Sequence, residues 1–376
     1  MNIVLAITGT VIVIVVLWEA FETIILPRQV TRRWRITRLF YRSTWHLYSR
    51  LVEPLPKKTR ERLLSFYGPL SLILLLSVWA LGLVLGFGLL HFVDGTVTGY
   101  GSASNRFGMA LYFSGSTQFT LGLGDVAPNT PLSRFLTVAQ SFVGLGFLAI
   151  VVGYFPVLYQ AFSRREAQIT LLDARAGSPP SATELLRRQA GGSGYEEIYN
   201  LLKDWERWSA ELMESHLSYP ALCFFRSQHD YESWLSALAT ILDASALVLV
   251  GIDEACEHQA QLTFAIARHA VVDISQVLNQ APVHGKTERL SREDLIRLRG
   301  VLSEAGIQLH DGQEADQRLS DLISMYEPYL VALSQLLLMP LPQWIREGRP
   351  DNWQTSAWGR ITSGGSTKPT HVEQHL

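Results

Sequence analysis

Cysteine and charge are both scarce in this chain. Its 376 residues include two cysteines, Cys223 and Cys256, which are too few for a disulfide framework. We expect both thiols to be reduced, buried and inert, because they fall in the part of the chain that we assign to the cytosol. Charged residues make up 18% of the chain and hydrophobic residues 48%, a composition that is unusual for a soluble protein. The longest apolar segments therefore decide the class of the protein.

Signals of catalysis and of nucleotide binding are also missing. The chain after residue 167 has no alternating strand pattern and no G-x-G-x-x-G motif, which argues against a Rossmann-type domain there. No nucleophile and base stand out as a pair, so we predict no enzymatic activity and no cofactor. Possible metal ligands cluster at Asp253, Glu254, Glu257 and His258, with His269 further along. A charged start of a helix explains this cluster more simply than a metal site.

Three apolar segments are long enough to cross a bilayer: Ile3–Leu26, Pro69–Val93 and Leu132–Phe162. The first has neither a basic start nor an A-x-A cleavage site, which predicts an uncleaved anchor. A fourth apolar run, Trp234–Val250, is short and is interrupted by Asp243. We interpret this run as a buried core helix of a second domain.

A few polar residues lie in or beside these spans. Glu19 and Glu22 are one helical turn apart near the inner end of the first span. Carboxylates at membrane depth invite a functional interpretation, but we favour an interfacial position beside the arginines that follow. We also interpret His91, at the end of the second span, as an interfacial residue rather than a pH sensor.

The segment between the first two spans is strongly basic. Eleven Lys or Arg residues occur in Arg28–Arg62 against two glutamates, and aromatic residues lie between them. A short loop this basic predicts a cytoplasmic location and a helix on the anionic inner leaflet of the lipid bilayer, rather than nucleic-acid binding. The alternative is a voltage sensor, because Arg32, Arg35 and Arg38 recur at every third position. A single preceding span makes the sensor the weaker interpretation.

A short glycine-bearing stretch lies between the second and third long spans. Ala110–Pro128 reads ALYFSGSTQFTLGLGDVAP. The preceding Arg106–Phe119 is too short to span and predicts a re-entrant helix, which is allowed only where protein or water surrounds the loop that follows. Backbone carbonyls can all face one axis only if alternate residues take opposite-handed conformations. Gly122 and Gly124 adopt such conformations at little cost because they have no Cβ atom.

This stretch resembles the selectivity filter of the potassium channel superfamily, whose carbonyls replace the hydration shell of potassium. The resemblance implies four copies around an axis, hence a homotetramer. It implies potassium binding at Thr120, Leu121, Gly122 and Leu123. Gly124 completes the filter, and Asp125 then lies at the outer mouth. Potassium is the permeant ion and not a cofactor.

The resemblance extends to the residues behind the filter. Tyr112 and Phe113 match the aromatic pair of the family's pore helix, and Thr117 matches a hydroxyl position that supports the filter. Ser116 stands where some members have a glutamate that pairs with the mouth aspartate, so we expect weaker bracing. Leu123 replaces the usual Tyr or Phe between the glycines, and this departure leaves a weakly selective monovalent-cation pore as the alternative to a potassium-selective one.

The third span carries the features of an inner helix. Gly144 lies where the family has its hinge glycine, and Gly146 and Pro156 follow as further positions for a hinge or gate. Close helix packing is the alternative role for the glycines. The helical period predicts that Leu145, Leu148 and Val152 line the cavity.

The chain after Ala167 predicts a helical domain. Gly177–Ser181 and Gly191–Gly194 read as flexible linkers. We expect helices over Leu262–Leu278 and Leu319–Met339, and a capping box at Ser291. Another amphipathic helix has its apolar stripe at Ile198, Leu201, Trp205, Trp208 and Leu212.

Together these patterns predict an all-α membrane protein with three transmembrane helices, a re-entrant pore helix and a cytoplasmic helical domain whose ligand the sequence leaves unknown. We assign residues 1–27 to an N-terminal anchor, 28–65 to a basic interfacial segment, 66–162 to the pore domain, 163–350 to the helical domain and 351–376 to a disordered tail. The expected function is a potassium channel in a prokaryotic inner membrane. A weakly selective cation channel and a membrane signalling protein with a vestigial pore are the alternatives.

Overall fold

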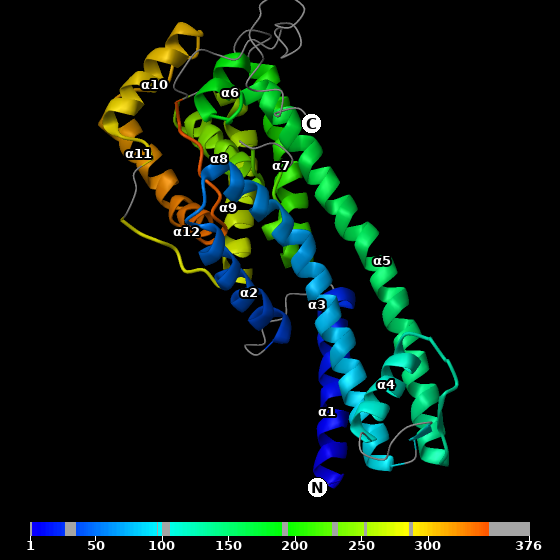
Figure 1. Cartoon of the computed structure of the whole chain (residues 1–376). Helices are drawn as coiled ribbons and strands as arrows, with labels where there is room; N and C mark the ends of the chain where they lie inside the picture. The colour runs from blue at the N-terminus through cyan, green and yellow to red at the C-terminus, as the bar shows by residue number, and fades with distance from the viewer. Residues whose placement is uncertain are drawn as a thin grey trace, which may run out of the picture. The chain divides into compact units, whose positions relative to one another are not determined.

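The computed structural model describes residues 2–26, 35–95, 97–99, 106–189, 195–227, 232–251, 254–285 and 289–345 (Figure 1). The predictions for 28–34, 191–194, Asp253 and 351–376 lie outside these residues. The chain divides into two compact units, Met1–Gln160 and Ala161–Leu376. This division falls two residues before the expected end of the pore domain.

The first unit is a bundle of helices with one short pair of strands. Its helical elements are α1 (Asn2–Ala20), a π-helical turn (Phe21–Ile25), α2 (Ile36–Val52), α3 (Lys57–Asp94), α4 (Arg106–Gln118) and the first part of α5 (Pro131–Ala176). The strands β1 (Val97–Gly99) and β2 (Val126–Pro128) pair antiparallel. The predicted all-α class is confirmed, and the strand pair is its only departure among the described residues.

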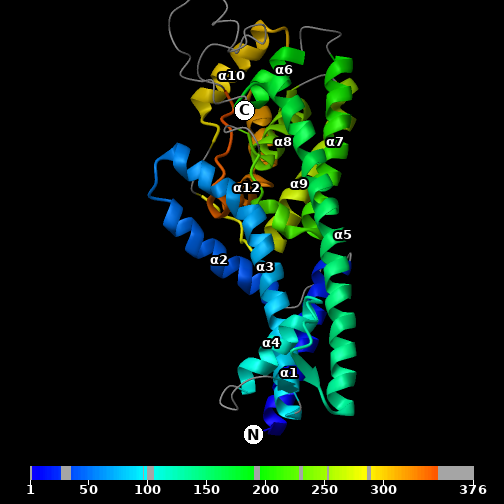
Figure 2. The same ribbon diagram turned by 45° about the vertical axis from the view of Figure 1, so that its right-hand side comes forward.

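The first span packs on the second. Helices α1 and α3 run side by side in both views (Figure 1, Figure 2), and two glycines allow the backbones to meet. A Cβ atom on Gly9 would lie 2.7 Å from the carbonyl oxygen of Gly86, and one on Gly86 would lie 3.0 Å from the oxygen of Gly9. Small residues at such a crossing are typical of helix pairs in membranes, where close van der Waals packing drives association.

Glu19 at the end of α1 and Glu22 in the π-helical turn that follows are both buried in the protein. Glu19 accepts hydrogen bonds from the backbone amide (3.2 Å) and the hydroxyl (3.0 Å) of Thr37. Glu22 accepts from the indole of Trp18 at 2.7 Å and pairs with Arg35 at 3.7 Å. The predicted neighbourhood of arginines is therefore present at Glu22, and both carboxylates attach the start of α2 to the end of α1.

Helix α2 forms a hairpin with the start of α3. The last part of the predicted basic segment, from Lys57 onward, therefore belongs to the same helix as the second span. Helix α3 begins at Lys57 and continues through Pro69, where we had expected its first residue. Trp45 of α2 is buried and packs edge-on against Tyr67, with ring centroids 4.7 Å apart. The hydroxyl of Tyr48 donates to the carbonyl of Leu63 at 2.7 Å. These aromatic rings therefore pack on α3.

Within the described ranges, four helices are long and apolar enough to cross a membrane: Asn2–Ile25, Lys57–Asp94, Pro131–Ala176 and Trp234–Gly251. The last of these, α8, is buried along its whole length inside the second unit, which confirms the predicted core helix. Helix α5 extends beyond the predicted end of the third span at Phe162 and ends at Ala176. It therefore belongs to both units.

The second unit is entirely helical in its described part. Besides the end of α5 it contains α6 (Ala182–Gln189), α7 (Tyr195–Ser218), a 3-10 turn (Pro220–Phe224), α8 (Trp234–Gly251), α9 (Glu254–Val277), α10 (Arg292–Glu304), α11 (Gln313–Ser324) and α12 (Glu327–Leu337). Every residue of the predicted apolar stripe on α7 is buried, as expected. Ser291 caps α10 by accepting from the amide of Asp294 at 3.1 Å, which confirms the predicted helix start.

Two expectations for this unit are wrong. Gly177–Ser181 is not a flexible linker, because it forms a turn with Pro180 and Ser181 buried and leads directly into α6. The expected single helix over Leu319–Met339 is two helices, which break at Met325 and Tyr326. Tyr326 is fully buried and its hydroxyl donates to Asp243 at 2.7 Å, so a tertiary contact fixes the break.

Candidate pore and selectivity filter

The pore helix lies where the sequence predicts it, on the second span. Helix α4 ends at Gln118, and its backbone approaches α3 so closely that a Cβ atom on Gly88 would lie 2.8 Å from a methyl group of Leu111. Phe113 is buried and packs edge-on against His91 of α3, with ring centroids 4.9 Å apart. These contacts fix the position from which the filter segment departs.

The filter segment alternates in backbone handedness. Thr120, Gly122 and Gly124 have positive φ angles of 56°, 58° and 78°, whereas the intervening Leu121 and Leu123 do not. An L-residue pays about 1–2 kcal/mol for this region and glycine does not, which explains both glycines. The predicted alternation is therefore present, and it includes one position, Thr120, that has a side chain.

Three successive amides of the filter point at the end of the pore helix. The amide of Thr120 donates to the carbonyl of Thr117 at 3.2 Å, and the amide of Leu121 donates to the carbonyl of Ser116 at 2.8 Å. The amide of Gly122 donates to the Ser116 hydroxyl at 3.2 Å. With these amides satisfied from behind, the filter carbonyls are available for a cation.

The mouth of the filter is held by side chains and by the strand pair. The hydroxyl of Tyr112 donates to Asp125 at 3.3 Å, which links the pore helix to the residue after the last filter glycine. Strand β2 follows directly and pairs with β1. The hydroxyl of Thr130 donates to Asp94 at 2.7 Å and connects the start of α5 to the end of α3. Each end of the filter is thus anchored to the helices around it.

Most of the membrane-spanning part of α5 is uncovered in the single chain. Leu145, Leu148 and Val152, the expected cavity residues, are each more than half exposed. Phe119, Leu121 and Leu123 of the filter region are also exposed, as are Phe135, Val138 and Phe142 in the preceding turns of α5. Apolar surface of this extent on a membrane helix faces either lipid or further protein.

The two glycines of α5 have different surroundings. A Cβ atom on Gly144 would lie 2.5 Å from the carbonyl oxygen of Gln118, whereas one on Gly146 would meet nothing within 4 Å. Gly144 therefore serves close packing against the end of the pore helix. The hinge or gate role of Gly144, Gly146 and Pro156 stays a prediction; all three lie inside one continuous helix.

His91 is fully buried inside the protein. Its Nε2 is 3.2 Å from the side-chain oxygen of Gln140 on α5. The amide group of Gln140 donates to the carbonyl (2.9 Å) and to the hydroxyl (2.7 Å) of Ser114 in the pore helix. The sequence gives no sign of this network, because its members are distant in the chain.

Outside the pore, we interpret the cluster of possible metal ligands on α9 as a charged helix start. Of its members Glu257 pairs with Arg318 at 3.3 Å, and the described residues contain no group of three or more ligand side chains. Cys223 and Cys256 are buried as expected, and burial raises the pKa of the Cys223 thiol to about 12, so this thiol is unreactive.

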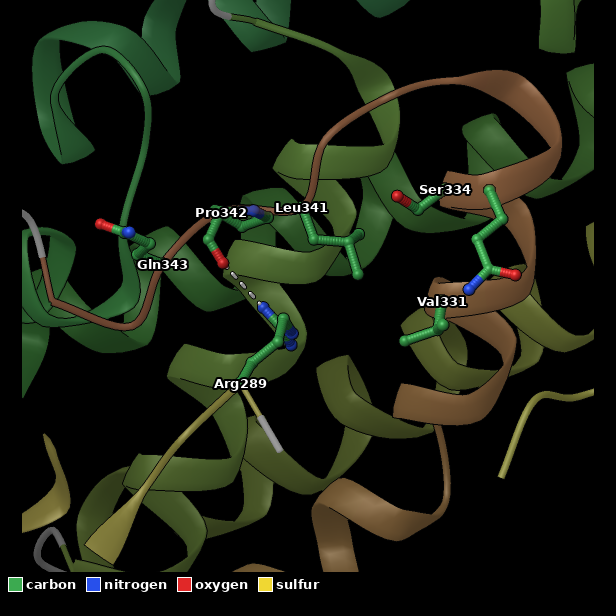
Figure 3. A pocket seen from close by; sticks show the side chains of 7 residues that line it. Arg289, Val331, Ser334, Leu341, Pro342 and Gln343 are labelled. Atoms are coloured by element: carbon green, nitrogen blue, oxygen red, sulfur yellow. Dashed lines mark hydrogen bonds between the residues drawn. The ribbon is translucent and has the colours of Figure 1, made fainter. Parts of the chain in front are cut away.

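A cavity of about 350 Å³ lies in the second unit beside Arg289 (Figure 3). The guanidinium of Arg289 donates to Pro342 O at 3.1 Å and pairs with Asp243 (2.8 Å) and Glu327 (2.7 Å). Burial raises the pKa of Asp243. Because every donor of Arg289 is engaged by protein oxygens, we interpret this cluster as a brace between α8 and α12.

The geometry of a short pore helix, an alternating filter segment and two flanking spans defines a pore-loop channel fold. Comparison with known proteins agrees: residues 73–160 match the model of a family described as an ion channel. This match confirms the resemblance to the potassium channel superfamily for the pore region, and the chain is a multi-pass membrane protein.

A relative extends the match beyond the pore. The uncharacterized membrane protein YdjJ of Bacillus subtilis (strain 168) is 27% identical over 241 residues, which are 63% of this chain and 69% of the relative. No solved structure gives a significant match.

Proposed function

We propose that the chain forms a homotetrameric, potassium-selective channel whose filter is built from Thr120–Gly124. One observation carries the proposal: positive φ angles at alternate positions, Thr120, Gly122 and Gly124. With the amides of 120 to 122 turned to the pore helix, this backbone can present consecutive carbonyls to one axis. Four such strands around the axis replace the water shell of a potassium ion.

The exposed apolar residues support the tetramer. One strand supplies one carbonyl per level, which is too few to coordinate an ion. Neighbouring subunits would cover the exposed apolar surface of α5 and the side chains of Leu121 and Leu123. Leu145, Leu148 and Val152 would then line the shared cavity below the filter.

Two hydrogen bonds compensate in part for the missing filter aromatic. Leu123 cannot donate a hydrogen bond to the pore helix, but Tyr112 donates to Asp125, and the Ser116 hydroxyl accepts from Gly122. Both connect the pore helix to the filter around Leu123. They favour potassium selectivity over the weakly selective pore that Leu123 alone suggests, and Ser116 acts as a direct support where we expected a weakness.

For topology we propose that the second unit and the basic segment both face the cytoplasm of a prokaryotic cell, by the positive-inside rule. We further propose that α2 contacts anionic lipid of the inner leaflet. Leu39, Leu47 and Leu51 are exposed on it, and Arg42 and Arg50 lie on the same side. This combination of exposed leucine and arginine fits the boundary between acyl chains and anionic head groups.

The helical unit is proposed to control the pore through α5. Arg165, in the extension of α5, is buried and donates to the carbonyls of Leu222 (3.0 Å) and Phe225 (3.0 Å). A rearrangement of α7 and the turn after it would therefore act on the same helix that carries the cavity residues.

Ion flux tests the proposal. Purified protein in liposomes loaded with potassium should release potassium when an ionophore lets protons exchange, and Gly124→Ala should not. Efflux equal to that of empty liposomes would favour the signalling protein with a vestigial pore. Native mass measurement in detergent should give four chains, and a monomer or dimer under conducting conditions would contradict the tetramer.

A further inference from the structure

Three buried polar side chains meet behind the filter, one from each helix that surrounds it. His91 lies in α3, Ser114 in α4 and Gln140 in α5, and each is fully buried. Polar groups inside a membrane-spanning bundle are costly unless they are paired with one another. Three of them at one place, in helices that are otherwise mostly apolar, therefore indicate a specific role.

The hydrogen bonds of this network fix the orientation of each member. The Ser114 hydroxyl donates to the carbonyl of Val84 at 2.8 Å, so its oxygen is left as an acceptor. The amide nitrogen of Gln140 must then face Ser114, and its oxygen must face His91. It follows that the Nε2 atom of His91 carries the proton and donates to Gln140.

Gln140 is also one of the two residues at which the central part of α5 is buried. Between Arg134 and Gly153, Gln140 and Gly144 are the only buried residues of α5. Gln140 bonds Ser114, and one turn later Gly144 packs on Gln118, one turn further along the pore helix. Helices α4 and α5 thus meet at two matched contacts, of which only the first is polar.

The turn of the pore helix that follows Ser114 holds the filter. Ser116 and Thr117 accept the amides of residues 120 to 122. We propose that Gln140 is a positioning residue for ion selection: it holds the pore helix between α3 and α5, His91 sets its orientation, and the filter keeps its carbonyl spacing as a result. This proposal rests on the proposed channel function.

The test uses variants that differ in one hydrogen bond at nearly constant volume. Gln140→Leu removes both the donor to Ser114 and the acceptor for His91. His91→Leu and His91→Gln both remove the imidazole, but the glutamine keeps a donor for Gln140. Thr137→Val is the matched control, because the Thr137 hydroxyl bonds only the carbonyl of Ser133 in its own helix, at 2.7 Å.

Two measurements on the full-length protein separate the network from the channel function. Hydrogen exchange of the amides in 110–118 reports on the pore helix whether or not the protein conducts. Gln140→Leu and His91→Leu should speed this exchange at least about fivefold, as expected for one lost hydrogen bond, and His91→Gln and Thr137→Val should not. Reversal potentials should show the permeability ratio of potassium to sodium falling in the same two variants alone.

Each result decides a different point. Unchanged exchange in Gln140→Leu, or equal effects of His91→Leu and His91→Gln, would overturn the network. Faster exchange in channels with an unaltered permeability ratio would overturn the role in ion selection. A wild-type protein that passes no ions would refute the proposed function instead, while the exchange data would still decide whether the network holds the pore helix.

Discussion

Gly144 of α5 and Gln118 of the pore helix are in backbone contact: a Cβ atom at position 144 would lie 2.5 Å from the carbonyl oxygen of Gln118 and 3.3 Å from its Cα atom. Real Cβ contacts are never this short, so even a methyl group must push the two helices apart. Gln118 lies two positions before the first filter residue, Thr120. Helix α5 therefore contacts the pore helix directly below the base of the filter.

Gly144→Ala should accordingly be damaging. We expect a loss of about 1–3 kcal/mol per subunit from overpacking, seen as a lower melting temperature of the assembled protein and reduced potassium flux. Gly146→Ala is the matched control, because its Cβ would meet nothing within 4 Å of the same chain. Equal behaviour of the two variants would contradict the packing role and favour a flexible hinge.

Gly122→Ala and Gly124→Ala should abolish conduction without loss of assembly. A Cβ atom would meet nothing within 4 Å at either position, so the cost comes from the positive φ angle, about 1–2 kcal/mol in each subunit. Potassium flux and native mass should be measured together. Gly153→Ala makes the same chemical change at a helical position with open space around it and should conduct normally. A conducting Gly124→Ala protein would refute the filter assignment.

Arg165→Met should destabilise the helical unit strongly. The change removes the donor to the carbonyl of Phe225 and one of the two donors to the carbonyl of Leu222, which still accepts from the amide of Phe225 at 3.1 Å. It also removes the partner of the Nε2 of His216, which lies 3.2 Å from Arg165. Burial and the charge of Arg165 hold the pKa of His216 well below its usual value, so this nitrogen accepts a hydrogen bond. We expect a loss of about 2–4 kcal/mol in thermal unfolding of the full-length protein.

The neighbouring arginine provides the comparison for this experiment. Arg164 is exposed, and Arg164→Met removes the same charge from the same helix turn. Its unfolding should match the wild type within about 0.5 kcal/mol. Similar losses in both variants would mean that charge at the end of α5, and not the contacts of Arg165, stabilises this unit.

Glu232 should make the stability of the helical unit fall as pH rises. Burial, followed by the charges of Asp173 and Glu166, raises its pKa from 4.5 to about 7 in the folded protein. Between these values the folded state binds a proton that the unfolded state has released, so unfolding becomes easier with increasing pH. The loss of stability caused by Glu232 is complete above about pH 7 and absent below pH 4.5.

Glu232→Gln removes this titration. The variant should melt at a higher temperature than the wild type at pH 8 and at nearly the same temperature at pH 4.5, where both side chains are neutral. Thermal unfolding of full-length protein across this range is the measurement. A wild-type melting temperature that rises between pH 5 and pH 7 in step with this side chain would contradict the assignment.

The sequence predicts those parts of the fold that local pattern determines. The hydropathy of the three spans, the apolar stripe on α7 and the glycines of the filter each depend on neighbouring residues, and each agrees with the structure. The apolar run of α8 is short and is interrupted by Asp243, and this pattern also predicts a core helix rather than a span.

The remainder depends on partners that are distant in the chain. His91 can be buried because Gln140, 49 residues later, accepts a hydrogen bond from its ring, and no pattern in the sequence around His91 predicts this partner. Ser116 stands where some members of the superfamily have a glutamate that pairs with the mouth aspartate. In the folded chain its hydroxyl accepts a hydrogen bond from the amide of Gly122 instead. The apolar run predicts a second span that begins at Pro69, but helix α3 already begins at Lys57, and α2 packs along the residues before Pro69.

The central claim is that this filter selects potassium, and reversal potentials under bi-ionic conditions test it most directly. Purified wild-type protein in a planar bilayer, with potassium chloride on one side and an equal concentration of sodium chloride on the other, should give a reversal potential close to that of a pore impermeable to sodium. Gly124→Ala should give no current. A wild-type reversal potential near zero would contradict potassium selectivity and identify a cation pore that does not discriminate between the two ions.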